Sequence, residues 1–204
     1  MSTDYLARIA DWNIRPAVPA AGRCALLVID MQEHFRFTAA GILDNIAALV
    51  QACRKSNMPV IFTRHGHRDP ASDGGMLGVW WSDLIRCGSP GWELLPEIAP
   101  GNAGCIIDKK RYSAFAGTDL DARLQANGVR ELIITGVLTN CCCETTARDA
   151  FVRDFRVFFV CDATATVSEE LHLASLKNLA FGFAHVVSAA QLQQQLGGAN
   201  GSPA

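Results

Sequence analysis

Short apolar runs that carry no polar face constrain the fold of this chain most strongly. Six of them recur along the sequence, at residues 24–30, 59–64, 104–109, 131–137, 156–162 and 184–189. Continuous apolar runs of this length, rich in β-branched residues, are typical of strands that are buried on both faces of a parallel sheet. We therefore expect six buried strands.

The segments between these runs have the periodicity of helices. Apolar residues recur at helical spacing over residues 42–53. Another helix is predicted to begin after Ser168, with Leu171, Ala174 and Leu179 on its apolar side. Alternating strands and helices predict an α/β fold: a doubly wound, mostly parallel six-stranded sheet with helices on both faces, in a Rossmann-like three-layer arrangement.

The size and charge of the chain limit its domain count and its partners. The 204 residues are half apolar, which suits one core, so we assign residues 1–204 to one domain with a disordered Gly/Ser/Pro-rich tail at residues 197–204. A net charge of −2 without a basic block predicts no nucleic-acid partner. The apolar runs are too short to span a membrane, and the N-terminus does not resemble a secretory signal, so we expect a cytoplasmic location.

The eight cysteines do not have the spacing of a metal site, because none of them forms a CxxC pair. Cys24, Cys105 and Cys161 lie in apolar runs, where a free cysteine behaves as a small core residue. A reduced intracellular protein is the simpler interpretation.

Polar residues follow several of the predicted strands at their carboxyl ends, which is where open α/β sheets bind ligands. Asp30 ends the first strand, His65 follows the second, Lys109 ends the third, a cysteine triplet at residues 141–143 follows the fourth, and Asp162 ends the fifth. A carboxylate there can accept the proton of a thiol, and an ammonium can stabilise the thiolate. Taken singly, each residue is more often a helix cap or a member of an ion pair.

The three adjacent cysteines are not expected to share one role. If a helix begins near Cys142, its apolar stripe contains Cys143, Ala147 and Phe151. Cys143 is therefore predicted to pack in the core. Periodicity does not choose between Cys141 and Cys142 as a nucleophile.

Three blocks of sequence resemble the isochorismatase-like cysteine hydrolase superfamily. They are LLVIDMQEHF at 26–35, IIDKKRYSAFAGTDLDARL at 106–124 and ELIITGVLTNCCCETTARDAF at 131–151. The resemblance extends from about residue 24 to residue 192 and implies that family's fold. The family's Asp-Lys-Cys triad would correspond to Asp30, Lys109 and Cys142, so it is the resemblance that selects Cys142.

The resemblance also implies the surroundings of the nucleophile. It predicts a cis peptide bond between Val137 and Leu138, and an oxyanion hole formed by the backbone N–H groups of Leu138 and Cys142. If Lys109 points into the site, its neighbour Lys110 should point away.

A thiol at the nucleophile position indicates an amidohydrolase that acts through a thioester on a small-molecule amide. The chain looks similar to plant-type nicotinamidases and to carbamoyl-amide hydrolases, so a nicotinamide-like or carbamoyl amide is expected. Two alternatives stay open. One is isochorismatase-type hydrolysis of a vinyl ether, which converts isochorismate to 2,3-dihydroxy-2,3-dihydrobenzoate and pyruvate without needing Cys142. The other is a thiol redox-sensing protein that uses the cysteine triplet.

A connection of about forty residues, 64–103, follows the second strand and is expected to build the substrate pocket. The residues expected to line the pocket, each of which could equally belong to the core, are Phe35, His65, Trp81, Tyr112 and Phe115. Metal-binding nicotinamidases carry an Asp-x-His pair where this chain has TRHGHRDP, with His65 in place of that aspartate. We therefore expect no metal and no cofactor, although His65, His67 and Asp69 remain an alternative set of metal ligands. We also expect a homo-oligomer.

Overall fold

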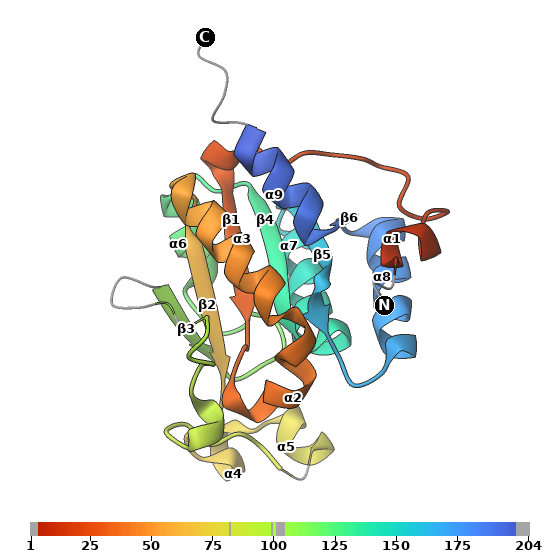
Figure 1. Cartoon of the computed structure of the whole chain (residues 1–204). Helices are drawn as coiled ribbons and strands as arrows, with labels where there is room; N and C mark the ends of the chain where they lie inside the picture. The colour runs from red at the N-terminus through yellow and green to blue at the C-terminus, as the bar shows by residue number, and fades with distance from the viewer. Residues whose placement is uncertain (1–3, 82, 99, 101–104, 199–204) are drawn as a thin grey trace.

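The computed structural model describes residues 4–81, 83–98, 100 and 105–198, and a six-stranded sheet lies at its centre (Figure 1). The strands are β1 (Cys24–Ile29), β2 (Val60–His65), β3 (Cys105–Lys109), β4 (Glu131–Val137), β5 (Arg156–Ala165) and β6 (His185–Val187). Their order is β3-β2-β1-β4-β5-β6, and each neighbouring pair is parallel. The predicted doubly wound α/β fold is confirmed.

Helices cover both faces of this sheet. The α-helices are α1 (Tyr5–Arg8), α2 (Arg36–Ala39), α3 (Leu43–Lys55), α4 (Pro70–Asp73), α5 (Met76–Trp80), α6 (Leu120–Ala126), α7 (Glu144–Val152), α8 (Glu169–Gly182) and α9 (Ala189–Gly198). Shorter turns are η1 (Ala21–Arg23), η2 (Glu33–Phe35), η3 (Ala40–Ile42), η4 (Pro90–Trp92) and the π-helical η5 (Thr139–Cys143). In the part of the chain that the structure describes, no helix combines the length and the apolar character needed to cross a membrane.

Two hydrophobic cores form on opposite faces of the sheet, because side chains alternate along each strand. In β1, which is buried throughout, Leu27 and Ile29 join a core with residues of α6, α7 and α8. Leu26 and Val28 join a second core with residues of α3 and α9. This burial on both faces explains the continuous apolar runs of β1 and β4, whereas the edge strand β3 exposes Ile106 and Asp108, contrary to the expectation of six buried strands.

The helix α8 begins as predicted but buries a different side. The Ser168 hydroxyl accepts a hydrogen bond from the N–H of Leu171, at 3.3 Å, and so caps the helix. Leu171 and Ala174, expected on its apolar side, are exposed. The buried side contains Leu179 together with two polar residues, His172 and Ser175. Hydrophobic periodicity did not detect this side because polar contacts hold it.

Two further expectations differ from the structure. Phe151, assigned to the apolar stripe with Cys143, is 46% exposed and packs edge-on against Phe183. The predicted tail at residues 197–204 begins inside α9, which extends to Gly198, and its remainder lies outside the described residues.

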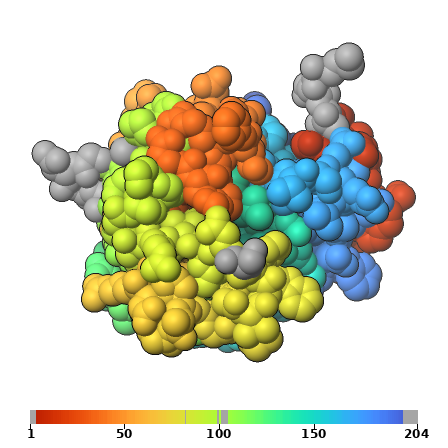
Figure 2. Space-filling model, turned by 90° about the horizontal axis from the view of Figure 1, so that it is seen from below, coloured from red at the N-terminus to blue at the C-terminus, as the bar shows by residue number. Residues whose placement is uncertain are grey.

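The topology places a site between β1 and β4. The chain leaves β1 toward β2 and β3 on one side, then crosses to β4 on the other, so the connections diverge at the carboxyl ends of these two strands. The segments α2, α4 and α5 gather at this end of the sheet (Figure 1), and Figure 2 shows α2 and residues of the 66–98 segment forming much of that face.

Candidate active site

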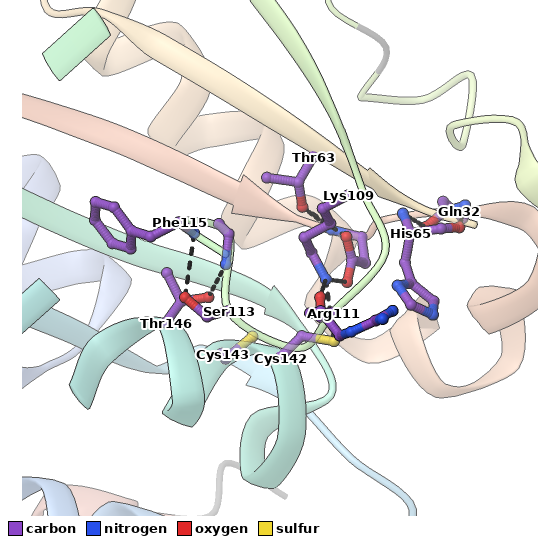
Figure 3. A network of polar contacts seen from close by, with 12 residues as sticks. Gln32, Thr63, His65, Lys109, Arg111, Ser113, Phe115, Cys142, Cys143 and Thr146 are labelled. Atoms are coloured by element: carbon purple, nitrogen blue, oxygen red, sulfur yellow. Dashed lines mark hydrogen bonds and ion pairs between the residues drawn. The ribbon is translucent and has the colours of Figure 1, made fainter. Parts of the chain in front are cut away.

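Asp30, Lys109 and Cys142, three of the predicted site residues, meet at the carboxyl edge of the sheet, and Figure 3 labels Lys109 and Cys142. The ammonium nitrogen of Lys109 lies 2.7 Å from Asp30 Oδ2 and 3.3 Å from the sulfur of Cys142. All three residues are buried, with exposed fractions of 0% for Asp30, 2% for Lys109 and 6% for Cys142. One cation therefore bridges a carboxylate and a thiol in a site that excludes most water.

Asp30 is held in place by the neighbouring strand. It directly follows β1 with a positive φ of 49°, a conformation that aspartate tolerates better than most residues. The Thr63 hydroxyl, from β2, donates to Asp30 Oδ1 at 2.6 Å and accepts from the Asp30 N–H at 3.1 Å. These two bonds orient the carboxylate and leave Oδ2 to face Lys109.

Lys109 is the last residue of β3 and points inward. Its ammonium group also donates to the carbonyl of Arg111 at 3.0 Å, so its three N–H groups all have partners. Lys110, the next residue, has a side chain that is 52% exposed and pairs with Asp73 at 3.1 Å. The expectation that Lys110 points away is confirmed.

Cys142 is carried by the π-helical turn η5, between β4 and α7. The peptide bond between Val137 and Leu138 is cis, at the position that the family resemblance implied. Within the turn, the N–H of Cys143 donates to the carbonyl of Leu138 at 3.2 Å, five residues back. The helix thus starts with one wide turn, which places Cys142 on the side that faces Lys109.

A close approach of β4 to β1 helps to bring these groups together. A Cβ atom added to Gly136 would lie 2.0 Å from the carbonyl oxygen of Ile29, and the φ of Gly136 is 113°. Any other residue would push the two strands apart. Glycine is therefore required one residue before the end of β4.

The cysteine triplet resolves into three different environments. Cys143 is fully buried in the core with Ala147, as periodicity predicted. Cys141 is half-buried. Cys142 is the cysteine whose sulfur contacts Lys109. The choice between Cys141 and Cys142, which periodicity left open, has a geometric basis in that contact.

Burial and charge act against each other on the thiol. Burial raises the pKa of Cys142 well above that of an ordinary thiol, and Lys109 only partly opposes this. Burial also works to lower the pKa of Lys109, but Asp30 and Cys142 outweigh it and the pKa is raised. Both shifts favour a neutral thiol beside a charged ammonium in the resting site, so Cys142 would have to lose its proton before it could act as a nucleophile.

Among the expected pocket residues, His65 lies beside this site (Figure 3). Its backbone is clamped by Gln32, which accepts from the His65 N–H at 2.8 Å and donates to its carbonyl at 3.0 Å. Burial, with help from Lys109, lowers the pKa of His65 to about 4. The imidazole is therefore neutral near neutral pH.

Two aromatic residues of the expected pocket are joined to each other. Trp81 follows α5 and is 46% exposed, and its indole N–H donates to the hydroxyl of Tyr112 at 2.7 Å. Tyr112 lies on the loop that follows Lys109 and β3, so this bond ties the end of α5 to that loop. Phe35 is half-buried and packs against the core beneath α3.

Phe115 does not line the pocket as expected. It is 5% exposed, lies in the core against Phe155, and points away from Lys109 and Cys142 in Figure 3. The reason is the fold of the loop after β3, which the Thr146 hydroxyl fixes by accepting from the N–H of Ala114 at 3.0 Å. That bond turns the next side chain into the core.

The alternative set of metal ligands is not assembled. His67 Nδ1 pairs with Asp73 at 3.1 Å, and Asp69 caps α4 by accepting from the N–H of Ala71. Within the described ranges, no three His, Cys, Asp or Glu side chains are grouped as metal ligands. The residues after β2 therefore do not fit the metal site of the metal-binding nicotinamidases.

Several functional contacts were not predicted. Thr63 is a polar residue within β2 and was an available signal. Thr139 and His172, which bond to each other at 2.9 Å, gave no signal that periodicity could detect. Asp162, predicted to end the fifth strand, lies inside β5, which continues to Ala165, and its carboxylate accepts from the N–H of Ala189 at 2.7 Å.

Known proteins resemble this chain in sequence and in fold. Residues 24–191 match the family model of the isochorismatase domain. Nicotinamidase 3 of Arabidopsis thaliana is 48% identical over 188 residues, which cover 91% of this chain and 94% of that protein. Enterobactin synthase component B of Escherichia coli is 34% identical over 198 residues, covering 94% of this chain and 68% of that protein.

Solved structures give the same result. The crystal structure of a cysteine hydrolase from Pseudomonas syringae pv. phaseolicola matches with a TM-score of 0.86 at 30% identity, covering 91% of this chain and 99% of the other. The fold, the matched domain and these likenesses agree with each other. The chain therefore belongs to the isochorismatase family and is a hydrolase.

Proposed function

We propose that this protein is a cysteine-dependent amidohydrolase that cleaves the C–N bond of a small-molecule amide through a thioester. The observation that carries the proposal is the contact of the Lys109 ammonium with both Asp30 and Cys142 in a buried site. A carboxylate within reach can accept the thiol proton, and the cation beside both groups favours the thiolate that forms.

In the first half of the reaction, the proton of Cys142 passes to Asp30. The negative charge moves from the carboxylate to the sulfur, and Lys109 remains next to it throughout. The thiolate then attacks the amide carbon, and the backbone N–H groups of Leu138 and Cys142 stabilise the oxyanion. Asp30 returns its proton to the departing ammonia or amine as the C–N bond breaks, which leaves an acyl group on the sulfur.

In the second half, water replaces the amine. Asp30, now a carboxylate again, accepts a proton from a water molecule as its oxygen attacks the thioester carbon. The C–S bond breaks, the carboxylic acid leaves, and the proton on Asp30 returns to the sulfur. Each step uses the same carboxylate and the same cation, so the site begins and ends in one charge state.

The substrate is proposed to be a nicotinamide-like or carbamoyl amide. Support comes from the 48% identity to a protein named nicotinamidase and from the bonded aromatic residues Trp81 and Tyr112, the second of which lies three residues after Lys109. Flat aromatic walls suit a planar ring. The neutral imidazole of His65 offers hydrogen bonding without charge, which fits an uncharged amide.

A substrate panel with matched cysteine variants tests the proposal. Nicotinamide, carbamoyl amino acids and ureidoacrylate are assayed for ammonia, and isochorismate is assayed for pyruvate. We expect ammonia release from an amide, a loss of kcat of at least about 10⁴-fold in Cys142→Ala, and a far smaller loss in Cys141→Ala. Rapid quenching followed by mass spectrometry should find the acyl group on Cys142.

The alternatives give different results. Pyruvate release that survives Cys142→Ala would support vinyl ether hydrolysis and contradict the nucleophile. A wild-type protein that releases neither product, yet forms reversible disulfides within the cysteine triplet under peroxide, would support the redox-sensing alternative.

A further inference from the structure

A series of buried, hydrogen-bonded polar groups holds the turn that carries Cys142 in place. Thr139, the first residue of η5, lies 2.9 Å from His172 Nδ1 on α8. The other ring nitrogen, Nε2, lies 3.0 Å from the carbonyl oxygen of Cys161 on β5. Thr139 is 0% exposed and His172 is 4% exposed, so neither side chain exchanges these partners freely for water.

The direction of these hydrogen bonds follows from the chemistry of the partners. A carbonyl oxygen only accepts, so Nε2 of His172 must carry the proton and donate to Cys161. In a neutral imidazole Nδ1 is then bare, and it accepts from the Thr139 hydroxyl. Burial lowers the pKa of His172, which favours this neutral form. With this one tautomer, every polar group in this series of hydrogen bonds has a partner.

The same helix also holds the far end of the turn. The Ser175 hydroxyl, one helical turn after His172, donates to the carboxylate of Glu144 at 2.5 Å. Between the two, the Thr166 hydroxyl donates to Asn140 at 2.6 Å. Polar contacts from β5 and α8 thus flank Cys142 on both sides along the chain, while Lys109 faces its sulfur.

We propose that His172 is a positioning residue: through Thr139 it fixes the π-helical turn so that the sulfur of Cys142 stays within reach of Lys109. This inference rests on the proposed role of Cys142 as a nucleophile. A π-helical turn is rare, is used mostly at functional sites, and places its residues differently from an α-helical turn. Without the hydroxyl contact, the turn could relax toward ordinary helix and rotate the sulfur away from its partners.

The surroundings of His172 should allow substitution. Its ring packs against Tyr5, and it borders a cavity of about 390 Å³ that opens to solvent and is also lined by Asn45, Thr166 and Glu169. A different side chain at position 172 can therefore change its conformation, and the substitution leaves no sealed cavity. Variants at this position are expected to fold.

Four single variants separate positioning from mere packing. His172→Phe keeps the ring shape and Thr139→Val keeps the side-chain shape, but each removes the hydrogen bond between them. His172→Gln keeps one acceptor and one donor, and Thr139→Ser keeps the hydroxyl. The first pair should lower kcat about 10–100-fold with KM changed less than about twofold, because small displacements of a reacting group cost this much.

The conservative pair should recover most of the activity. The double variant His172→Phe/Thr139→Val should be no worse than either single variant, because both remove the same bond and their effects are not additive. Alkylation of Cys142 by iodoacetamide, mapped by peptide mass spectrometry without substrate, should slow by a similar factor in the first pair. The melting temperature of each variant reports on folding.

Two results would overturn the inference. Lower melting temperatures with unchanged kcat and unchanged alkylation of Cys142 would leave His172 a packing residue. Additive losses in the double variant would show that Thr139 and His172 act independently. Because alkylation is measured without substrate, a failure of the amidase proposal would not be mistaken for a failure of this one.

Discussion

The floor and the rim of this site are built in opposite ways. Asp30, Lys109 and Cys142 form the floor: Asp30 follows β1, Lys109 ends β3, Cys142 lies on η5 after β4, and each of the three is almost completely buried. The rim, residues 76–81, is one short helix and the residue after it, with Trp80 at 75% and Trp81 at 46% exposed. Figure 2 shows the face that includes this segment.

The difference lies in how many contacts fix each part. Asp30 is oriented by Thr63 on β2, and Lys109 is oriented by Asp30 at the end of β1 and by the Arg111 carbonyl two residues after β3, so the sheet largely determines their positions. Among the described residues, the rim is tied to the site by the bond from Trp81 to Tyr112, and the residues just before it by Arg111, which donates to the carbonyl of Asp73 at 3.0 Å. Chemistry placed on a rigid sheet and recognition placed on a lightly held loop is a common division in enzymes. Substitutions in the floor should therefore change kcat, and those in the rim should change KM.

The largest effect is expected from Lys109→Met. The variant removes the cation that favours the Cys142 thiolate and leaves Asp30 buried without its ion-pair partner. We expect kcat to fall about 10³-fold and the free energy of unfolding to fall by about 3–5 kcal/mol. Steady-state kinetics and urea unfolding measure the two effects.

Lys110→Met is the matched control, because the same change is made one residue away. Its side chain is half exposed and pairs with Asp73 at the surface, and exposed pairs contribute little. Activity should stay within about twofold of wild type, and stability within about 1 kcal/mol. Equal losses in the two lysine variants would break the distinction between the buried floor and its surroundings.

The sequence predicted the floor well because the sheet imposes two strong patterns. Buried strands read as apolar runs, and the carboxyl ends of parallel strands share one edge. Asp30, Lys109 and the cysteine triplet could therefore be placed together before the structure was known. The choice of Cys142 needed the family resemblance, because helical periodicity does not describe a π-helical turn such as η5.

The remaining differences arise where polar contacts override hydrophobic pattern. Helix α8 buries His172 and Ser175 and exposes Leu171, because the two polar residues have partners on η5 and at the start of α7. Phe115 enters the core because of a hydrogen bond to Thr146 from the backbone beside it. Such pairs join residues far apart in sequence, so one sequence without relatives does not disclose them.

His65 lies between floor and rim, and its titration tests whether it belongs to the floor. Its pKa is lowered from 6.5 to about 4, mainly by burial. The unfolded chain therefore binds more protons than the folded chain between these values. Stability from the neutral, buried His65 is complete above about pH 6.5 and declines as the pH falls toward 4, by on the order of 3 kcal/mol.

His65→Gln should remove this part of the pH dependence. Urea unfolding of wild type and variant at pH 7 and pH 4.5 should show a smaller decrease for the variant. His34→Gln, at an exposed histidine, should follow the wild type. If the His65 variant loses as much stability as the wild type on acidification, His65 is hydrated in solution and should be grouped with the rim.

The smallest effect is expected from the rim itself, in Trp81→Phe. The change removes the N–H that donates to Tyr112 and keeps an aromatic ring. A neutral hydrogen bond contributes about 0.5–1.5 kcal/mol. We expect KM to rise about two- to tenfold, with kcat within about twofold of wild type, because the floor is untouched.

Trp80→Phe is the control for this change, since Trp80 is the neighbouring residue and is more exposed. Its KM should remain within about twofold of wild type. A fall in kcat for Trp81→Phe, with KM unchanged, would contradict the division between floor and rim. It would mean that the bond to Tyr112 affects Lys109 through the loop that follows it, so that recognition and chemistry are coupled through that loop.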